Sequence, residues 1–157
     1  MTSPRLLRRA TAPQDLIEDY SKDRRHSPTQ QLYRQGRCDA MAIALHRVTG
    51  LPLVAITGQR KDGKGGWCNE QAHVGVSPGE ERWIDVDGLH RGIPKDRLMF
   101  LRPPDRIRLL PTTEKVVRTL YTRSGVPESE VTLAIRFIAR DPTLRELVRR
   151  YTRAPRG

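Results

Sequence analysis

The chain has 157 residues, of which 36% are hydrophobic and 30% are charged, and its mean hydropathy is −0.63. These values suit one globular domain, and no run approaches the roughly 18 consecutive apolar residues of a membrane helix. Two cysteines exclude a disulfide scaffold, and no signal-peptide pattern follows the basic residues of the first ten. We therefore expect a cytoplasmic protein, or one delivered by a signal-peptide-independent route, without a transmembrane segment.

The net charge of +11 first suggests a nucleic-acid partner, but the charge is distributed unevenly. Residues 31–90 hold 7 basic and 7 acidic groups, whereas residues 91–157 hold 16 basic and 7 acidic groups. The excess of positive charge therefore suggests that the C-terminal part binds a partner, either an acidic protein or a nucleic acid. It says little about what the neutral centre of the chain does.

The first elements in chain order are two predicted helices. Thr11 can cap a short helix that has Pro13 in its first turn. Residues 38–49 are rich in Ala, Leu, Ile and Met, which favour a helix. Gly50 follows them, at the position where helices end in a left-handed residue. This second helix is the clearest element of the sequence.

Strands are predicted next, and a second group of helices follows them. Alternating or apolar runs predict strands over residues 53–57, 72–76, 82–87 and 106–110, with a glycine-rich loop over 58–69 and a turn over 77–80. The turn is too short for a parallel crossover, so we expect an antiparallel sheet. From residue 112 the apolar residues recur with the spacing of a helix, which predicts helices over 114–122, 127–139 and 142–151.

This order of elements predicts an α+β fold with a C-terminal helical appendage. We divide the chain into three parts. Residues 1–27 form an N-terminal basic arm and short helix, residues 28–110 form a core, and residues 111–157 form a basic helical tail.

Three residues in the core predict a nucleophilic site. Cys38 begins the clearest helix, where the free amides and the dipole stabilise a thiolate and the Cys38 N–H can face an oxyanion. If the strands around His73 and Asp85 turn their valines and isoleucines to one core, these two side chains share the opposite face. A carboxylate there can fix the tautomer of the imidazole, which in turn takes the thiol proton.

The register of this hairpin decides which carboxylate meets the histidine. A three-residue loop over 78–80 places Ser77 opposite Glu81, and His73 then faces Asp85 directly. A shift of two residues would bring Asp87 to His73 instead. Asp87 therefore stays open as an alternative third member.

The order of Cys38, His73 and Asp85 resembles the papain-like superfamily in a minimal form. This superfamily includes transglutaminase-like proteins, arylamine-acetyltransferase-like cores and papain-fold toxins. The matching segments are residues 36–38 with the alanine-rich helix that follows, residues 72–76, and residues 83–88. The resemblance implies a papain-like core, in which a helix carrying the cysteine packs on a small antiparallel sheet carrying the histidine and the aspartate. It also implies an upstream glutamine in the oxyanion hole, for which Gln35 and Gln31 are candidates.

Together these features predict a cysteine-dependent hydrolase or acyl-transfer enzyme, a peptidase or amidase, that acts on a protein or peptide carbonyl. Proteolysis, glutamine deamidation and transglutaminase-like chemistry all stay open, and the resemblance implies an effector or toxin role. We expect no cofactor and no metal, because Cys38, Cys68, His73 and His90 lack the spacing of a zinc site, and we place Cys68 and His90 in loops. The alternative is a non-catalytic basic adaptor that binds nucleic acid or an acidic protein.

Overall fold

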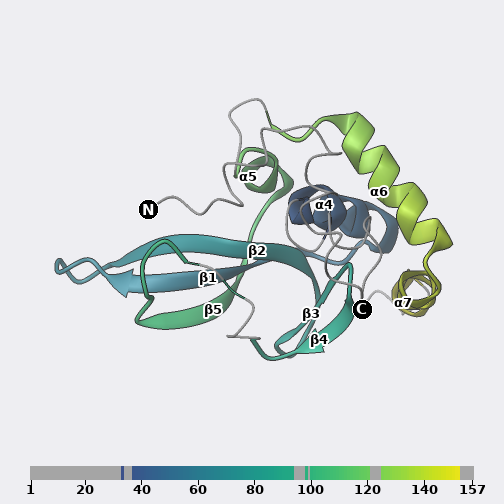
Figure 1. The fold of residues 1–157 in the computed structure, drawn as a ribbon. Helices are drawn as coiled ribbons and strands as arrows, with labels where there is room; N and C mark the ends of the chain where they lie inside the picture. Colours follow the sequence, from purple (N-terminus) through teal and green to yellow (C-terminus); the bar gives the residue numbers. More distant parts are fainter. Residues whose placement is uncertain (1–32, 34–36, 94–97, 99, 121–124, 153–157) are drawn as a thin grey trace, which may run out of the picture.

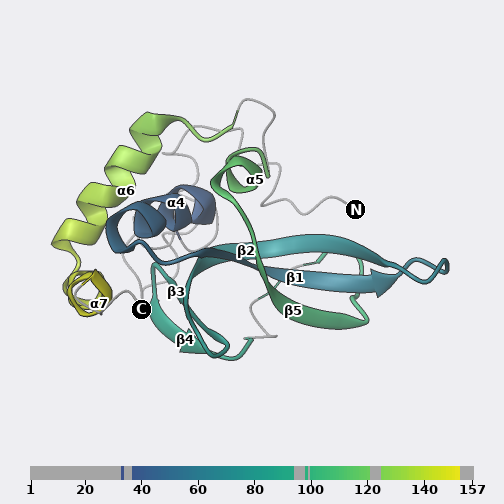
Figure 2. The same ribbon diagram turned by 180° about the vertical axis from the view of Figure 1, so that it is seen from behind.

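The computed structural model describes residues 33, 37–93, 98, 100–120 and 125–152, and the fold is given for these residues. Five strands form one antiparallel sheet in the order β4-β3-β2-β1-β5, and helices lie along one side of it (Figures 1 and 2). The elements are α4 (Cys38–Thr49), β1 (Leu53–Lys61), β2 (Trp67–Gly79), β3 (Arg82–Asp85), β4 (Gly88–Arg91), β5 (Arg106–Pro111), α5 (Glu114–Arg118), α6 (Glu128–Arg140) and α7 (Pro142–Thr152). The α+β class and the antiparallel sheet predicted from the sequence are confirmed. The arm and short helix predicted for residues 1–27 lie outside the described residues.

Helix α4 has the predicted bounds and lies at the centre of the protein. Gly50 ends it with a φ of 75°, and its N–H donates to the carbonyl of His46. All residues from Cys38 to Leu45 are buried, because α4 packs on β2 and β3 on one side and on α6 and α7 on the other. A helix that is apolar on every side suits this enclosed position.

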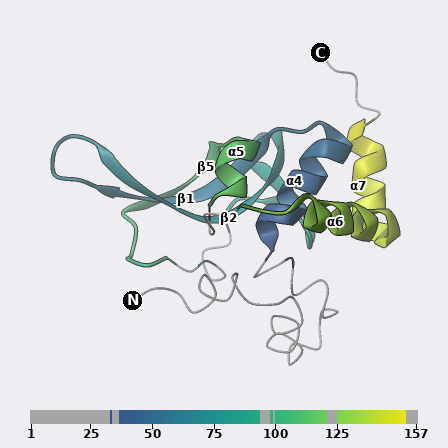
Figure 3. The same cartoon turned by 90° about the horizontal axis from the view of Figure 1, so that it is seen from above.

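The hairpin of β1 and β2 is longer than predicted, and the expectation of a loop over residues 58–69 is wrong. Residues 58–61 pair with residues 67–70, so that only residues 62–66 form the turn. This outer part of the hairpin carries polar residues on both faces and thus lacks the apolar alternation that marks a strand. Its tip projects away from α4 (Figures 1 and 3).

The predicted register between β2 and β3 is wrong by two residues. Val76 pairs with Ile84 and Gly79 with Arg82, so Ser77 is not opposite Glu81. The cause lies in the turn, where Glu80 and Glu81 have φ values of 57° and 58°. Positive φ at both central residues is typical of a two-residue type I′ hairpin turn, which favours Asn-Gly rather than Glu-Glu.

The third predicted strand ends two residues earlier than expected, and a further strand that was not predicted follows it. β3 ends at Asp85, a tight turn follows, and β4 begins at Gly88, whose φ of 108° is unfavourable for other residues. Trp83 pairs with His90 and Ile84 with Leu89 across this second hairpin. His90, which the sequence places in a loop, is therefore a strand residue.

Helices α5, α6 and α7 confirm the helical pattern after residue 112, but α5 is shorter than predicted, because it ends at Arg118 and not at residue 122. They cover the side of α4 that faces away from the sheet (Figure 2). Arg47 of α4 links α5 and α6, because its guanidinium pairs with Glu114 of α5 at 2.5 Å and with Glu128 of α6 at 2.7 Å. Among the described residues, no helix has the length and apolar character that crossing a membrane requires.

Candidate active site

The site begins at the first turn of α4, where Cys38 is 6% exposed and faces the sheet. A thiol at this position experiences the positive end of the helix dipole and the free amides of the first turn, both of which favour the thiolate. The next residue, Asp39, is also buried, and its Oδ1 accepts a hydrogen bond from the Ala40 N–H at 2.7 Å. The carboxylate of Asp39 thus helps to satisfy the amides at the start of this helix.

The structure brings His73 and Asp85 together across β2 and β3. The Nε2 atom of His73 lies 2.9 Å from Oδ2 of Asp85, and the two side chains are 12% and 4% exposed. His73 and Asp85 are in contact although the predicted register was wrong by two residues, because residues two positions apart on facing strands are still diagonal neighbours. Asp87, the alternative third member, instead donates its backbone N–H to Oδ1 of Asp85 at 2.9 Å.

Cys38 forms a side-chain hydrogen bond with the same imidazole ring. The ring has two nitrogens, and Nε2 is already directed at Asp85. Its Nδ1 atom is therefore the nitrogen available to the sulfur. One imidazole thus connects a thiol at a helix N-terminus with a buried carboxylate.

The charges of these groups stabilise one another. Burial lowers the pKa of His73, but the negative charge of the Cys38 thiolate and the hydrogen bonds with Asp85 and Cys38 outweigh it and raise this pKa from 6.5 to about 10. Burial likewise raises the pKa of Asp85, but hydrogen bonds from His73 and His90 hold it well below its usual range. At neutral pH the site therefore holds a protonated His73 imidazole beside an ionised Asp85 carboxylate.

A second histidine, missed at the sequence level, completes the surroundings of Asp85. The Nε2 atom of His90 lies 2.7 Å from Oδ1 of Asp85, so the two carboxylate oxygens hold two different imidazoles. The His90 ring stacks on Trp83 with centroids 4.1 Å apart, and the Trp83 indole N–H donates to the carbonyl of Gly92 at 2.8 Å. The sequence held one signal for this contact. Trp83 and Asp85 lie two residues apart and so share one face of their strand, and His90 joins that face only if a turn is assumed at residues 86–87.

Gly75 allows β3 to approach β2 closely at this point. A Cβ atom added to Gly75 would lie 2.5 Å from the backbone oxygen of Ile84, the residue that precedes Asp85. The absence of a side chain at Gly75 is therefore what lets the strand carrying Asp85 lie beside the strand carrying His73.

An ion pair links the start of α4 to α6. Arg37 precedes Cys38, is 8% exposed as a residue, and pairs with Glu130 at 3.0 Å. Burial and the charge of Glu130 raise the pKa of the nearby Tyr33 to about 12, so this phenol stays neutral. Glu130 thus compensates the charge of the buried Arg37 guanidinium at the start of α4.

The remaining candidates fall outside this cluster. Gln31 and Gln35 lie outside the described residues. Cys68 is exposed and lies on β2 near the tip of the long hairpin, opposite Arg60, and not in a loop. In the described ranges, no three His, Cys, Asp or Glu side chains are grouped so that they could hold a metal ion.

Comparison with known protein families, with curated proteins and with solved structures found no match to this chain. Its function is therefore inferred from the site itself.

Proposed function

We propose that the chain is a cysteine-dependent hydrolase or acyl-transfer enzyme, similar in its chemistry to papain-like and transglutaminase-like proteins. The observation that carries this proposal is the position of His73, which forms hydrogen bonds with both Cys38 and Asp85. A nucleophile, a base and a group that orients the base are the three parts of a nucleophilic site. The substrate is a carbonyl or carboxamide of a protein or peptide.

In the first step the thiolate of Cys38 attacks the carbonyl carbon and forms a sulfur–carbon bond. The electron pair of the C=O bond moves to the oxygen, which the backbone N–H of Cys38 at the helix N-terminus stabilises. When the C=O bond re-forms, the carbon–nitrogen bond breaks, and the leaving amine takes the proton from His73 Nδ1. The product of this step is a thioester on Cys38.

In the second step water or an amine attacks the thioester and gives its proton to His73. The sulfur–carbon bond breaks and Cys38 leaves as a thiolate beside the restored imidazolium. Asp85 keeps its proton-free form throughout, and its role is to hold the ring and stabilise the imidazolium charge. Water gives proteolysis or deamidation, and an amine gives a crosslink.

The two cysteines allow an internal test of this proposal. Cys38 is buried and Cys68 is exposed, so an unactivated Cys38 would react more slowly with iodoacetamide than Cys68. We expect the opposite at pH 6–7, where alkylation of Cys38, followed by peptide mass spectrometry, should be faster than that of Cys68. His73→Ala should slow the alkylation of Cys38 markedly and leave that of Cys68 unchanged.

A second measurement reports on acyl transfer. Wild-type protein mixed with p-nitrophenyl acetate should release nitrophenol in a burst and carry an acetyl group on Cys38. Cys38→Ala should show neither. Alkylation of Cys38 that is slower than that of Cys68 and indifferent to His73, together with no burst, would contradict the proposal.

A further inference from the structure

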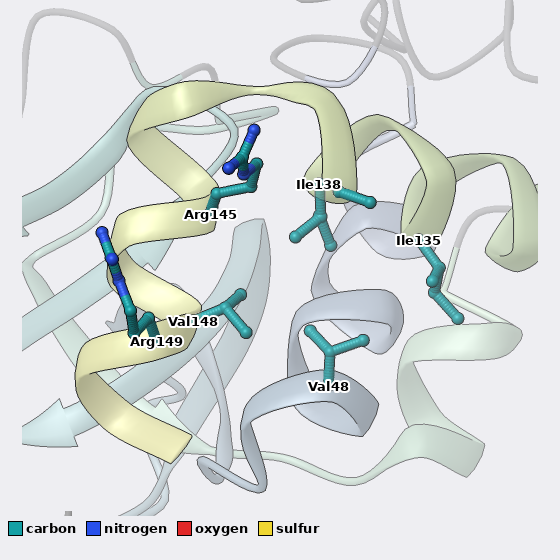
Figure 4. Close-up of a pocket in the computed structure, with 7 residues that line it drawn as sticks. Val48, Ile135, Ile138, Arg145, Val148 and Arg149 are labelled. Carbon is teal, nitrogen blue, oxygen red and sulfur yellow. The ribbon is translucent and has the colours of Figure 1, made fainter. Parts of the chain in front are cut away.

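A cavity of about 350 Å³ opens on the side of the protein formed by the last turn of α4 and by α6 and α7 (Figure 4). The side chains of Val48, Ile138 and Val148 converge on it, and Arg145 and Arg149 of α7 stand along one side (Figure 4). Its lining residues are Val48, Ile135, Ile138, Ala139, Arg145, Val148 and Arg149. Val48 is ten residues beyond Cys38, about 15 Å along the helix, so this groove is separate from the candidate active site.

The charges around the groove are mostly positive. Helices α6 and α7 expose five arginines, namely Arg136, Arg140, Arg145, Arg149 and Arg150. In the part of the chain that the structure describes, only Arg149 among them lies within ion-pair distance of a carboxylate, that of Glu146.

The other carboxylates of these helices are already engaged. Glu128 pairs with Arg47 and Arg118, and Glu130 pairs with Arg37. Asp141 accepts a hydrogen bond from the Leu144 N–H at 3.0 Å. The groove therefore has an apolar floor and an excess of positive charge beside it, because among the described residues Arg145 has no carboxylate within ion-pair distance and Arg149 has only one. Its complement is an apolar surface bordered by negative charge.

We propose that this groove binds an amphipathic helix of another protein, with acidic residues beside its apolar stripe. The groove is bounded by the last turns of α4 and α6 and by α7, which has 11 residues and is about 16 Å long. A helix laid in such a groove buries an apolar stripe spaced at i, i+3 or i+4, and i+7. A second copy of this chain, which carries a net charge of +11, would be repelled, and duplex DNA would leave the apolar floor unmatched. This inference does not depend on the chemistry of Cys38.

The test uses the whole chain and a fluorescent 16-residue peptide with leucines at helical spacing and glutamates on both sides of them. Fluorescence anisotropy should show saturable binding with a Kd below about 100 µM, which weakens as the salt concentration rises. A peptide of the same composition with the leucines scattered around the helix should bind at least about tenfold more weakly.

Two matched pairs of variants locate the binding site. The double variant Arg145→Glu/Arg149→Glu reverses charges that line the groove and should weaken binding by about tenfold or more. Arg140→Glu/Arg150→Glu makes the same change in net charge at exposed positions that do not line it, and should bind nearly as wild type does. Ala139→Trp fills the groove at an exposed helix position without changing charge, and should also weaken binding.

Several results would overturn the inference. These are equal weakening by both charge-reversed pairs, equal binding of the scattered peptide, and unchanged binding by Ala139→Trp in a variant with a wild-type circular dichroism spectrum. Binding to phosphatidylserine vesicles or to duplex DNA without binding to the peptide would assign the surface to a membrane or to nucleic acid. Self-association in sedimentation velocity would assign it to a second copy.

Discussion

The substitution Gly75→Ala probes how closely the strands that carry the site must approach. The new Cβ would lie 2.5 Å from the Ile84 carbonyl oxygen, whereas ordinary contacts begin near 3.4 Å, so β3 must move by about 0.9 Å. Asp85 follows Ile84, and the same movement would lengthen its 2.9 Å hydrogen bond to His73 beyond the usual limit. We therefore expect a loss of stability and a weaker contact between His73 and Asp85.

The size of the effect follows from the clash. An overpacked position costs about 1–3 kcal/mol, and for a chain of this length each kcal/mol lowers Tm by about 2–4 °C. Calorimetry should therefore show a Tm about 2–12 °C below that of wild type. Because Asp85 helps to raise the pKa of His73 to about 10, an NMR titration of the His73 ring should show a lower pKa in the variant.

Gly66→Ala is the matched control, since it makes the same change in the same hairpin. Its Cβ meets only the end of the exposed Asp62 side chain, at 2.7 Å, and no backbone atom, and the position lies at the hairpin tip. A Tm of Gly75→Ala within about 1 °C of that of Gly66→Ala, with an unchanged titration of His73, would refute the reasoning about the strand approach.

Two further substitutions test the groups around Asp85. His90→Phe keeps an aromatic ring on Trp83 but removes the donor to Asp85, and we expect a loss of about 1–3 kcal/mol in urea denaturation; unchanged stability would mean that this 2.7 Å contact contributes nothing. Asp85→Asn should cost about 3–5 kcal/mol at pH 7, because it removes one partner of a buried charged group. The folded-state pKa of Asp85 is depressed, so its contribution is present above the unfolded value of 3.8 and is lost as the pH falls below it. The difference in denaturation midpoint between wild type and Asp85→Asn should therefore shrink between pH 5 and pH 2, and a constant difference would argue against an ionised Asp85.

Local signals were enough to predict the helix that carries Cys38. The alanine-rich run and Gly50 act within a few residues of each other, and neither depends on the rest of the fold. Local signals also predicted β5 and the presence of helices after residue 112, because the apolar residues recur at regular spacing in these segments. The bounds of α4 therefore agree with the prediction.

The register and the ends of the hairpin strands could not be predicted, because the signals for them in the sequence are weak. The turn at Glu80 and Glu81 has a backbone that normally requires glycine or asparagine, so the preceding Pro78-Gly79 was the stronger turn signal. His73 and Asp85 meet nevertheless, because an error of two residues keeps every side chain on its own face. The contact of His90 with Asp85 could not be predicted, since it requires a strand of only four residues that directly follows a tight turn.

The burial of α4 has a consequence for how this protein can change over evolutionary time. Its first eight residues pack against the sheet and the C-terminal helices, and the proposed nucleophile is one of them. A substitution in this helix that alters the reactivity of Cys38 also alters the packing at the centre of the fold. Adaptation of the chemistry would therefore be constrained by stability, whereas the tip of the long hairpin, which projects away from α4, does not share this constraint.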